Sequence, residues 1–367
     1  MKNMSKVKGQ KSNVVVALSG GVDSSLAAAL LLEQGYNVIG AFMKNWSDTK
    51  TVRGECAWKE ERRDAQRVAV HLGIPLHTFD FEEVYRNEVV GYLFREYGAG
   101  RTPNPDVFCN SEVKFPLFWE EAKKLGADLI ATGHHVRKCQ ASSVKRQASE
   151  WKLLAGKDSN KDQSYFLHRL TQDDLSHTLF PIGEYTKEEV RTMARERGIP
   201  TADKRSTRGI CFVGKVSMPR FLSQAIKPAP GHIQTADGRT VGTHQGIAPY
   251  TIGQRHGFGV GGGTPYYVVE KNPVTNTLIV GDENDPRLFR SEIEIADMHW
   301  ISGDAPAFPF ACQARIRYRS ELVPCNLSIS PSLCLSVNFN KPMRAPASGQ
   351  FMVFYDHDVC VGGAVMI

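Results

Sequence analysis

The stretch Ser19–Ser25, SGGVDSS, holds residue types that can bind a phosphate group. It follows Val14–Leu18, an apolar run that predicts a buried strand, and it precedes Leu26–Gln34, which predicts a helix ended by Gly35. Glycines let the backbone approach a ligand, and the N–H groups and dipole of a helix N-terminus favour an anion. The run Asp23–Ser25 also supplies typical helix-capping residues, so two glycines alone would fit a plain capped turn equally well. All seven residues in this setting predict a phosphate site, and the missing Lys-Ser/Thr excludes a Walker A loop.

Two cysteines lie in segments that could make a thiol nucleophilic. Cys109 ends the proline-stiffened loop Gly100–Asn110, GRTPNPDVFCN, just before a helix predicted to begin near Glu112. A helix N-terminus lowers the pKa of a thiol, and so do nearby cations. Cys211 follows three such cations, Lys204, Arg205 and Arg208. Each cysteine also has a structural alternative, a helix-to-helix connection for Cys109 and an apolar, buried position for Cys211.

The elements around these residues predict a parallel sheet covered by helices on both faces, because strands alternate with helices. Ligands of such sheets bind at the carboxyl ends of the strands, so the Ser19 loop, Met43 and Gly133 are expected to meet. The polar segment Lys138–Glu150 is expected to be a loop, and Trp151–Ala155 a short strand. The other expected strands are Asn37–Phe42, Leu76–Phe81 and Asp128–Thr132, and the other expected helices are Trp58–Leu72, Glu82–Tyr97, Glu112–Leu125, Asp162–Leu170 and Thr186–Arg197.

The pattern changes in the C-terminal half. From Gly231 onward, short strands alternate with Gly, Pro and Asn turns, which is typical of β-barrels and sandwiches, and a break falls near Asp285. The predicted fold is therefore α/β, with a doubly wound parallel-sheet N-terminal domain, a small central mixed domain and a C-terminal antiparallel β-barrel. The expected domain ranges are residues 1–203, 204–285 and 286–367.

Composition narrows the functional class only slightly. The net charge of +6 permits nucleic-acid binding without arguing for it. No apolar run is long enough to cross a membrane, and the basic N-terminus lacks the apolar region of a secretory signal. The eight cysteines lack zinc-like spacing, so no structural metal is expected, and in a cytoplasmic chain they are expected to be unlinked thiols.

Several further motifs occur in one order with the two already described. They are FMKNW at Phe42–Trp46, ATGHH at Ala131–His135, KDQSYFL at Lys161–Leu167, RGICF at Arg208–Phe212, TIGQRHGFGVGG at Thr251–Gly262 and RYR at Arg317–Arg319. SGGVDSS resembles the pyrophosphate loop of the N-type ATP pyrophosphatases. From about Asn13 to its C-terminus, the chain closely resembles the bacterial tRNA-specific 2-thiouridylases of the MnmA type.

This resemblance implies ATP-dependent replacement of the C2 oxygen of the wobble uridine by sulfur. Transfer of AMP makes that oxygen a leaving group, and a cysteine persulfide then supplies the sulfur. By position, Cys109 would be the nucleophile and Cys211 the persulfide carrier. Either Cys109 frees sulfide from the persulfide, or the persulfide attacks the base and Cys109 resolves the resulting disulfide. The implied partners are ATP with Mg²⁺, tRNAs for glutamate, glutamine and lysine, and the persulfide relay of a cysteine desulfurase.

The resemblance also implies three sets of contacts, residue by residue. The nucleotide contacts are Ala17, Leu18, Ser19, Gly20, Gly21, Val22, Asp23, Ser24, Met43 and Gly133, with Asp23 helping to place Mg²⁺. The target-base contacts are Asn104, Pro105 and Asp106. The tRNA contacts are His134, Lys161, Asp162, Gln163, Arg317, Tyr318 and Gln350.

Some of these residues have a purely structural alternative. His134 could be a satisfied loop histidine, and Lys161 and Asp162 a plain helix start. Arg315, Arg317 and Arg319 would share one face of a strand, either solvated or bound to phosphates. Tyr318 would then point to the other face, so Arg317 and Tyr318 could both reach RNA only at a strand end or bend.

Two other functions compete with thiolation. One is a different pyrophosphate-loop enzyme, such as a 4-thiouridine, lysidine or amide-forming synthetase. The other is a tRNA-binding protein that holds ATP only as a ligand, which would bind tRNA with a steep salt dependence but form no AMP.

Overall fold

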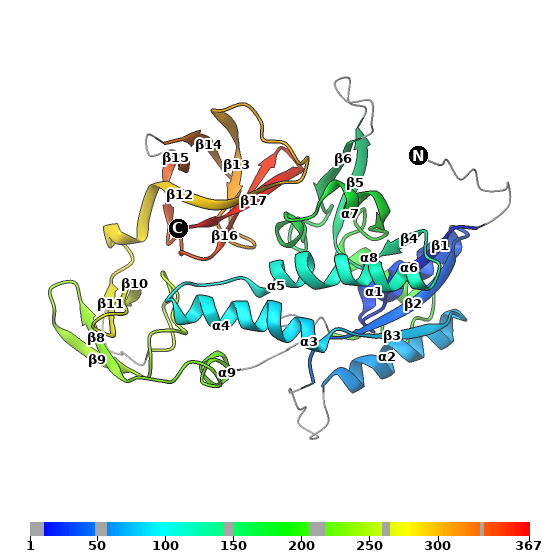
Figure 1. The fold of residues 1–367 in the computed structure, drawn as a ribbon, viewed down its shortest axis with the longest axis horizontal. Coiled ribbons are helices and arrows are strands. Elements are labelled where there is room, and N and C mark those ends of the chain that lie inside the picture. Colours follow the sequence, from blue (N-terminus) through cyan, green and yellow to red (C-terminus); the bar gives the residue numbers. More distant parts are fainter. Residues whose placement is uncertain (1–10, 48–56, 142–149, 206–216, 259–264, 331–333) are drawn as a thin grey trace. The chain divides into compact units, whose positions relative to one another are not determined.

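The computed structural model describes residues 11–47, 57–141, 150–205, 217–258, 265–330 and 334–367 (Figure 1). The chain divides into two compact units. The first comprises residues 1–86 and 109–214, and the second comprises residues 87–108 and 215–367. None of the described helices is long and apolar enough to cross a bilayer.

The first unit contains a parallel sheet with the strand order β3-β2-β1-β4-β7. The chain runs outward from β1 to β3 and then returns to place β4 on the other side of β1. This reversal creates a switch point between β1 and β4, where ligands of such sheets bind. The parallel sheet was predicted, but its short last strand was not. The bounds are β1 Asn13–Ala17, β2 Asn37–Lys44, β3 Leu76–Asp80, β4 Leu129–Ala131 and β7 Thr178–Leu179.

The helices of this unit include two whose ends the sequence predicted well. Gly35 and Gly198 end α1 and α8 at positive φ, and Thr186 and Glu189 form the predicted capping box of α8. The expected helix over Asp162–Leu170 is only a short 3₁₀ segment. The bounds are α1 Val22–Glu33, α2 Ala57–Leu72, α3 Glu82–Val84, α6 Pro116–Lys124, η3 Ser164–Leu167, α7 Gln172–His177 and α8 Lys187–Glu196.

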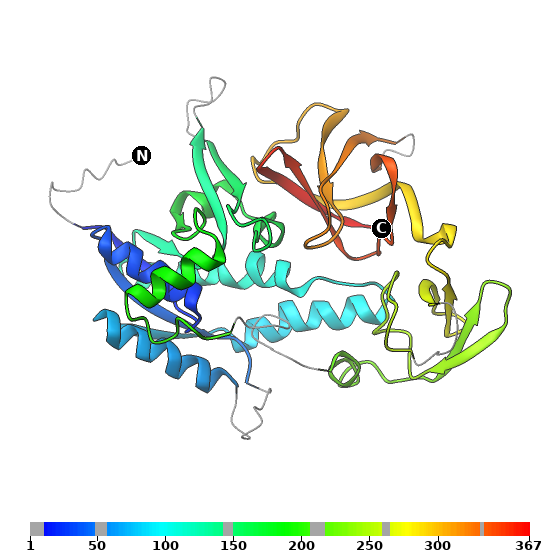
Figure 2. The same cartoon turned by 180° about the vertical axis from the view of Figure 1, so that it is seen from behind.

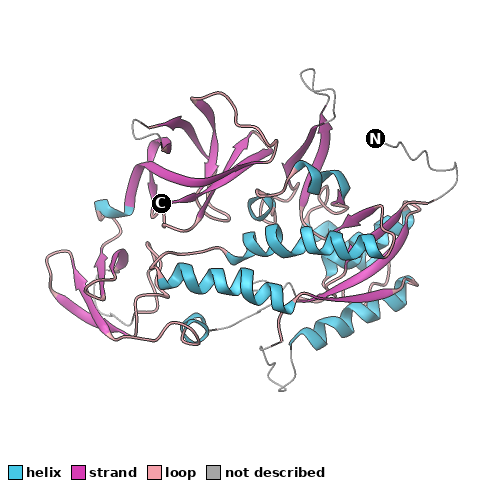
Figure 3. Ribbon diagram, in the orientation of Figure 1, coloured by secondary structure: helices cyan, strands magenta, loops and turns pink. Residues whose placement is uncertain are grey.

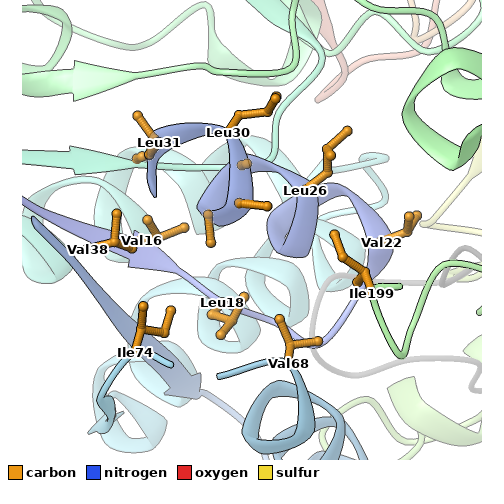
Figure 4. Packing of buried hydrophobic residues seen from close by; sticks show 14 of the residues in the cluster. Val16, Leu18, Val22, Leu26, Leu30, Leu31, Val38, Val68, Ile74 and Ile199 are labelled. Atoms are coloured by element: carbon orange, nitrogen blue, oxygen red, sulfur yellow. The ribbon is translucent and has the colours of Figure 1, made fainter. Parts of the chain in front are cut away.

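A hydrophobic core fixes α1 and β1 relative to each other. Val16 and Leu18 on one face of the β1 segment pack in the same cluster as Leu26 and Leu30 of α1 (Figure 4). Val15, which points to the opposite face, is also fully buried. Burial on both faces is the reason that β1 reads as a continuous apolar run. The turn between β1 and α1 is therefore held on a rigid support.

Two further predictions about local structure were wrong. The segment expected to be a loop begins with a strand, since β5 (Val136–Ala141) pairs antiparallel with β6 (Glu150–Ala155). The helix expected to start near Glu112 starts earlier, because α5 covers Pro105–Phe108 and a π-helical stretch, η2, covers Cys109–Lys114. Pro105 fits there because proline is tolerated in the first turn of a helix.

A second π-helical stretch interrupts the helix that was expected over Glu82–Tyr97. The segment is helical, but α3 passes into η1 (Tyr85–Val90) before α4 (Gly91–Gly98) begins. Extra residues in a helical turn are not visible in an apolar repeat, so the sequence could not reveal them.

The second unit contains two β-structures (Figures 2 and 3). A small sheet has the order β10-β11-β8-β9, and a larger one runs β12-β15-β14-β13-β16-β17 and closes by pairing β12 with β17. The predicted fold class is thus confirmed, including the antiparallel barrel. The bounds are α9 Met218–Leu222, β8 Gly231–Thr235, β9 Thr240–His244, β10 Tyr267–Asn272, β11 Thr277–Gly281, η4 Pro286–Leu288, β12 Phe289–Trp300, β13 Phe310–Arg315, β14 Val323–Ile329, β15 Leu335–Arg344, β16 Phe351–Asp356 and β17 Val359–Met366.

Candidate functional site

The turn after β1 is tied together by its own serines. The hydroxyl of Ser24 accepts a hydrogen bond from the N–H of Ser19 at 3.2 Å and donates to the carbonyl of Gly21 at 3.1 Å. The hydroxyl of Ser25 donates to the same carbonyl at 2.8 Å. Gly20 has φ of +73°, a conformation that glycine adopts without strain. These contacts, together with a hydrogen bond from the N–H of Gly21 to the hydroxyl of Ser19 at 3.4 Å, fix the shape of the turn.

The cap of α1 differs from the prediction. Gly21 is the N-cap residue, and Asp23, Ser24 and Ser25 lie inside the first turn rather than at the cap. The first hydrogen bond of the helix runs from the N–H of Ser25 to the carbonyl of Gly21. The N–H groups of the first turn, from Val22 to Ser24, have no intrahelical partner, and Gly21 has no side chain to cap them. They are the donors that an anion can use.

Two glycines allow neighbouring segments to approach this turn closely. A Cβ atom on Gly20 would lie 2.6 Å from the carbonyl oxygen of Glu61 in α2. A Cβ atom on Gly133, just after β4, would lie 2.6 Å from the nitrogen of Ser24. Gly133 therefore lies directly against the turn, as predicted for a second strand end at the switch point. Met43, near the carboxyl end of β2, is buried.

We expect Gly133→Ala to weaken use of ATP at this turn. The added methyl group meets backbone atoms of Asp23 and Ser24, so the turn itself must move, and the KM for ATP should rise about tenfold or more, with about 1–3 kcal/mol lost from stability. Gly98→Ala is the matched control, because nothing lies within 4 Å of its added Cβ atom. An ATP titration and a melting curve measure both effects, and an unchanged KM for Gly133→Ala would contradict this placement of the turn.

Asp23, in the first turn of α1, is held by two cationic or donor groups from other elements. The ammonium of Lys187, the first residue of α8, lies 2.6 Å from both carboxylate oxygens, and Nε2 of His135 lies 3.1 Å from one of them. Burial would raise the pKa of Asp23, but the His135 hydrogen bond and the Lys187 charge outweigh it and lower that pKa. Burial also lowers the pKa of Lys187 against the attraction of Asp23. At these distances we treat the pair as ionised at neutral pH.

The arrangement does not fit the expected role of Asp23 as a Mg²⁺ ligand. Mg²⁺ needs free oxygen ligands at short distance, and both Asp23 oxygens are occupied by the Lys187 ammonium. Over the described parts of the chain, no cluster of three or more histidine, cysteine or acidic side chains could hold a metal ion.

His134 and His135 follow Gly133 but have different surroundings. Nδ1 of His134 lies 2.8 Å from the hydroxyl of Thr132, and its ring stacks on Phe115. Burial, together with the charge of Lys114, lowers the pKa of His134 well below its ordinary value. His134 is therefore neutral at physiological pH, and a contact to tRNA would use hydrogen bonding rather than charge.

The segment Lys161–Gln163 is bound to the connection between β4 and β5, which carries these histidines. The side-chain oxygen of Gln163 accepts the N–H of His135 at 2.9 Å, and the N–H of Gln163 donates to the His135 carbonyl at 3.2 Å. The Asp162 carboxylate is buried and accepts three hydrogen bonds from Gly156 and Ser164. His135 thus joins this segment to Asp23, and the Asp162 side chain supports the segment from inside.

In the second unit, a predicted tRNA residue and the predicted target-base loop come together. The side-chain amide of Gln350 donates to the carbonyl of Pro103 at 3.2 Å, and the N–H of Thr102 donates to the carbonyl of Ser348 at 2.8 Å. The next residues, Asn104–Asp106, are part-exposed and lead into α5. The Ser348–Gln350 turn therefore supports the Asn104–Asp106 segment.

The guanidinium of Arg317 in the same unit donates to the carbonyl of Ala345 at 2.6 Å. The prediction that Arg315, Arg317 and Arg319 share one strand face was wrong, because β13 ends at Arg315. Arg319 has φ of +64°, so the chain turns at this point. Arg317 and Tyr318 lie in a bend, which is the condition under which both could reach RNA.

Cys109 does not lie at a helix N-terminus, contrary to the prediction. It follows α5 without a break and begins the π-helical stretch, and it is fully buried. The helix-dipole argument for a lowered thiol pKa therefore does not apply. The other predicted reactive cysteine, Cys211, lies outside the described residues.

Comparisons with known proteins show the family of the chain. A family model described as the tRNA methyl transferase HUP domain matches residues 12–215, and models of a PRC-barrel domain and an aminomethyltransferase β-barrel domain of related description match residues 219–282 and 290–366. A tRNA-specific 2-thiouridylase of Geobacillus kaustophilus is 46% identical over 361 residues, covering 97% of this chain and 96% of that protein. The chain belongs to the tRNA-specific 2-thiouridylase family. Members from Idiomarina loihiensis and Bacillus cytotoxicus are 44% and 46% identical, and each match covers at least 95% of both proteins.

Two residues of this site, His135 and Lys187, were not predicted. His135 belongs to the ATGHH motif, but no role was predicted for its side chain. The sequence does contain a signal for Lys187, because a positive charge in the first turn of a helix is unfavourable next to the helix dipole. Such a lysine needs a compensating partner, and Asp23 provides it.

Proposed function

We propose that the chain is a tRNA-uridine 2-sulfurtransferase. It would adenylate the C2 oxygen of the wobble uridine with ATP and then replace that oxygen by sulfur, giving 2-thiouridine, AMP and pyrophosphate. The observation that carries this proposal is the uncapped first turn of α1, with Gly133 against it, in a chain of the 2-thiouridylase family. This turn offers the N–H donors that a nucleotide phosphate needs.

The nucleotide would be bound by the segment Ala17–Ser24 with Met43 and Gly133, as the sequence predicts. We add Lys187 as the cation of this site, because its ammonium lies beside the first turn of α1. A fixed positive charge next to a phosphate stabilises the charge that develops as AMP is transferred. Mg²⁺ would arrive with the nucleotide and be held mainly by phosphate oxygens, since Asp23 is already paired.

The sulfur chemistry would use Cys109 and Cys211, and both predicted branches remain proposals. In either branch the Cys109 sulfur must reach the sulfur of Cys211, in the persulfide or in the disulfide that the persulfide forms with the base, and in the end a Cys109–Cys211 disulfide forms. The complete burial of Cys109 means that the segment around it must rearrange during the reaction. The π-helical stretch that begins at Cys109 suits such a change, because π-helical turns are weaker than α-helical ones and frequently occur at functional sites.

The tRNA would contact His134, the segment Lys161–Gln163, the Arg317–Tyr318 bend and Gln350. The Gln350 side chain also supports the base-contacting residues Asn104–Asp106. The acceptors we propose are the tRNAs for glutamate, glutamine and lysine, and the sulfur donor is the persulfide relay of a cysteine desulfurase. We also propose a cytoplasmic location, where tRNA, ATP and reduced thiols coexist. The domain ranges 1–203, 204–285 and 286–367 remain predictions.

In the deciding experiment, the protein is incubated with ATP, Mg²⁺, a persulfide donor and unmodified glutamate tRNA. The RNA is then digested, and the masses of its nucleosides are measured. We expect 2-thiouridine at the wobble position. A 4-thiouridine or lysidine product would instead favour another pyrophosphate-loop enzyme. Tight tRNA binding without AMP formation would favour a non-catalytic binding protein.

A further inference from the structure

The wall of the β-barrel contains a second pair of cysteines, separate from Cys109 and Cys211. Cys312 on β13 and Cys325 on β14 are direct partners in the antiparallel register, and their sulfur atoms lie 3.7 Å apart. Directly opposed residues of antiparallel strands have Cα atoms about 4.5–5.5 Å apart, which is within the range of a disulfide. Formation of the bond requires the two sulfur atoms to approach by roughly 1.7 Å.

The surroundings of the pair hold both thiols in place. Cys325 is buried in the barrel core with Leu327 and Ala314, and Cys312 is half-buried against the same core. Core packing limits the rotamers of both side chains, so the thiols cannot easily turn away from each other. The partial exposure of Cys312 gives an oxidant access to one of the two sulfurs.

The pair lies in a hairpin whose bend is part of the proposed tRNA contact. The two cysteines are thirteen positions apart and form the middle one of the five residue pairs in the hairpin that joins β13 to β14. The bend of this hairpin carries Arg317 and Tyr318, which we propose to contact tRNA. A bond between Cys312 and Cys325 would link the two strands of this hairpin covalently, two residue pairs from the bend, and a closed loop has fewer conformations to lose on binding.

We propose that Cys312 and Cys325 form an oxidisable dithiol site whose disulfide clamps the Arg317–Tyr318 hairpin in its RNA-binding shape. The inference about the disulfide stands on the geometry of the pair, and its consequence for RNA rests on the function proposed above. The oxidant is a hydroperoxide. One thiol attacks a peroxide oxygen, which breaks the O–O bond and gives a sulfenic acid and, from hydrogen peroxide, water. The second thiol displaces the hydroxyl group as a second water, so two electrons and two protons leave the cysteines.

The reaction should be slow in both directions. The neighbouring thiol Cys325 and burial, with a contribution from the Asp356 charge, raise the pKa of Cys312. Since the thiolate is the reactive form, such a thiol reacts slowly with peroxide, and a buried disulfide is slowly reduced. The pair therefore differs from a fast catalytic dithiol, and its oxidised form should persist through many turnovers.

The test treats the full-length chain with hydrogen peroxide, blocks free thiols with an alkylating agent, and identifies linked peptides by mass spectrometry without reduction. We expect a peptide pair joined through Cys312 and Cys325 and absent after dithiothreitol. The matched control is Cys334→Ser, which removes an exposed cysteine of the same barrel and should leave the link intact. Recovery of both cysteines in alkylated form after prolonged oxidation would overturn the proposal.

A second measurement tests whether the disulfide affects RNA binding, independently of whether it forms. Unmodified tRNA is titrated against the oxidised and reduced chain, and against Cys312→Ala given the same oxidant. We expect the oxidised chain to bind about threefold more tightly than the reduced one, and Cys312→Ala to show no oxidant-dependent gain. A link without any change in affinity would overturn the clamp. A link in a chain that never binds tRNA would support the dithiol site and refute the proposed function.

Discussion

Lys187→Met should reduce kcat/KM for ATP by about a hundredfold or more. The substitution removes the fixed positive charge beside the first turn of α1, and losing one preorganised charge at a reacting centre typically has an effect of this size. It also leaves the Asp23 carboxylate without its cation, which should destabilise the fold by about 2 kcal/mol. Pyrophosphate release with saturating tRNA measures the first effect, and a denaturant titration measures the second.

Two further variants distinguish the effect of the Lys187 charge from the effect of replacing a lysine side chain. Lys157→Met is the matched control, because Lys157 also pairs with a carboxylate, Glu189 of α8, but both partners are about half exposed. Exposed ion pairs contribute little, so this variant should behave like the unmodified chain. Lys187→Arg keeps the charge and should retain more activity than Lys187→Met. If Lys187→Met used ATP as well as the unmodified chain, Lys187 would have no role at the phosphate site.

A pH dependence follows from the same pair. The pKa of Asp23 is lower in the folded chain than in the unfolded one, so its contribution to stability is present at neutral pH and is lost as the pH falls through its folded value. Over this acidic range, the Lys187→Met variant should lose less stability than the unmodified chain. Without the Lys187 charge, the pKa of Asp23 in the folded variant lies closer to its value in the unfolded chain.

The sequence predicted the supporting fold well where one physical signal dominated. The run Val14–Leu18 is apolar at every position because both of its faces are buried, and α8 begins at a complete capping box. The glycine at position 133 was also placed correctly, because carboxyl ends of neighbouring parallel strands must meet. These are local or near-local rules that need no knowledge of side-chain contacts.

The failures share a different physical origin. The start of α5 and the π-helical stretch at Cys109 depend on how the segment packs, and no spacing of apolar residues encodes an inserted residue in a helical turn. The Lys187–Asp23 pair joins residues 164 positions apart, so nothing near Asp23 in the sequence reveals its partner. For the same reason, the sequence did not show that both Asp23 oxygens, proposed to help place Mg²⁺, are paired with the Lys187 ammonium.

Cys109→Ser should reduce formation of 2-thiouridine by about a thousandfold or more, because in either branch its sulfur must attack the Cys211 persulfide or the disulfide that this persulfide forms. The variant should still bind ATP, since Cys109 is not part of the phosphate site. Cys360→Ser is the control for substitution of a buried cysteine, and it should thiolate tRNA normally. Nucleoside mass spectrometry after a fixed reaction time measures the loss, and normal thiolation by Cys109→Ser would contradict the assignment.

The same variant distinguishes the two branches, because they stop at different places. If the Cys211 persulfide attacks the adenylated base directly, AMP leaves and the tRNA stays joined to Cys211 through a disulfide that Cys109 can no longer resolve. A denaturing gel without reductant should then show a protein–tRNA adduct that dithiothreitol releases as thiolated tRNA. If Cys109 instead frees sulfide from the persulfide, the variant releases none, and no adduct forms. In that branch the persulfide stays on Cys211, where alkylation and mass spectrometry detect the extra sulfur.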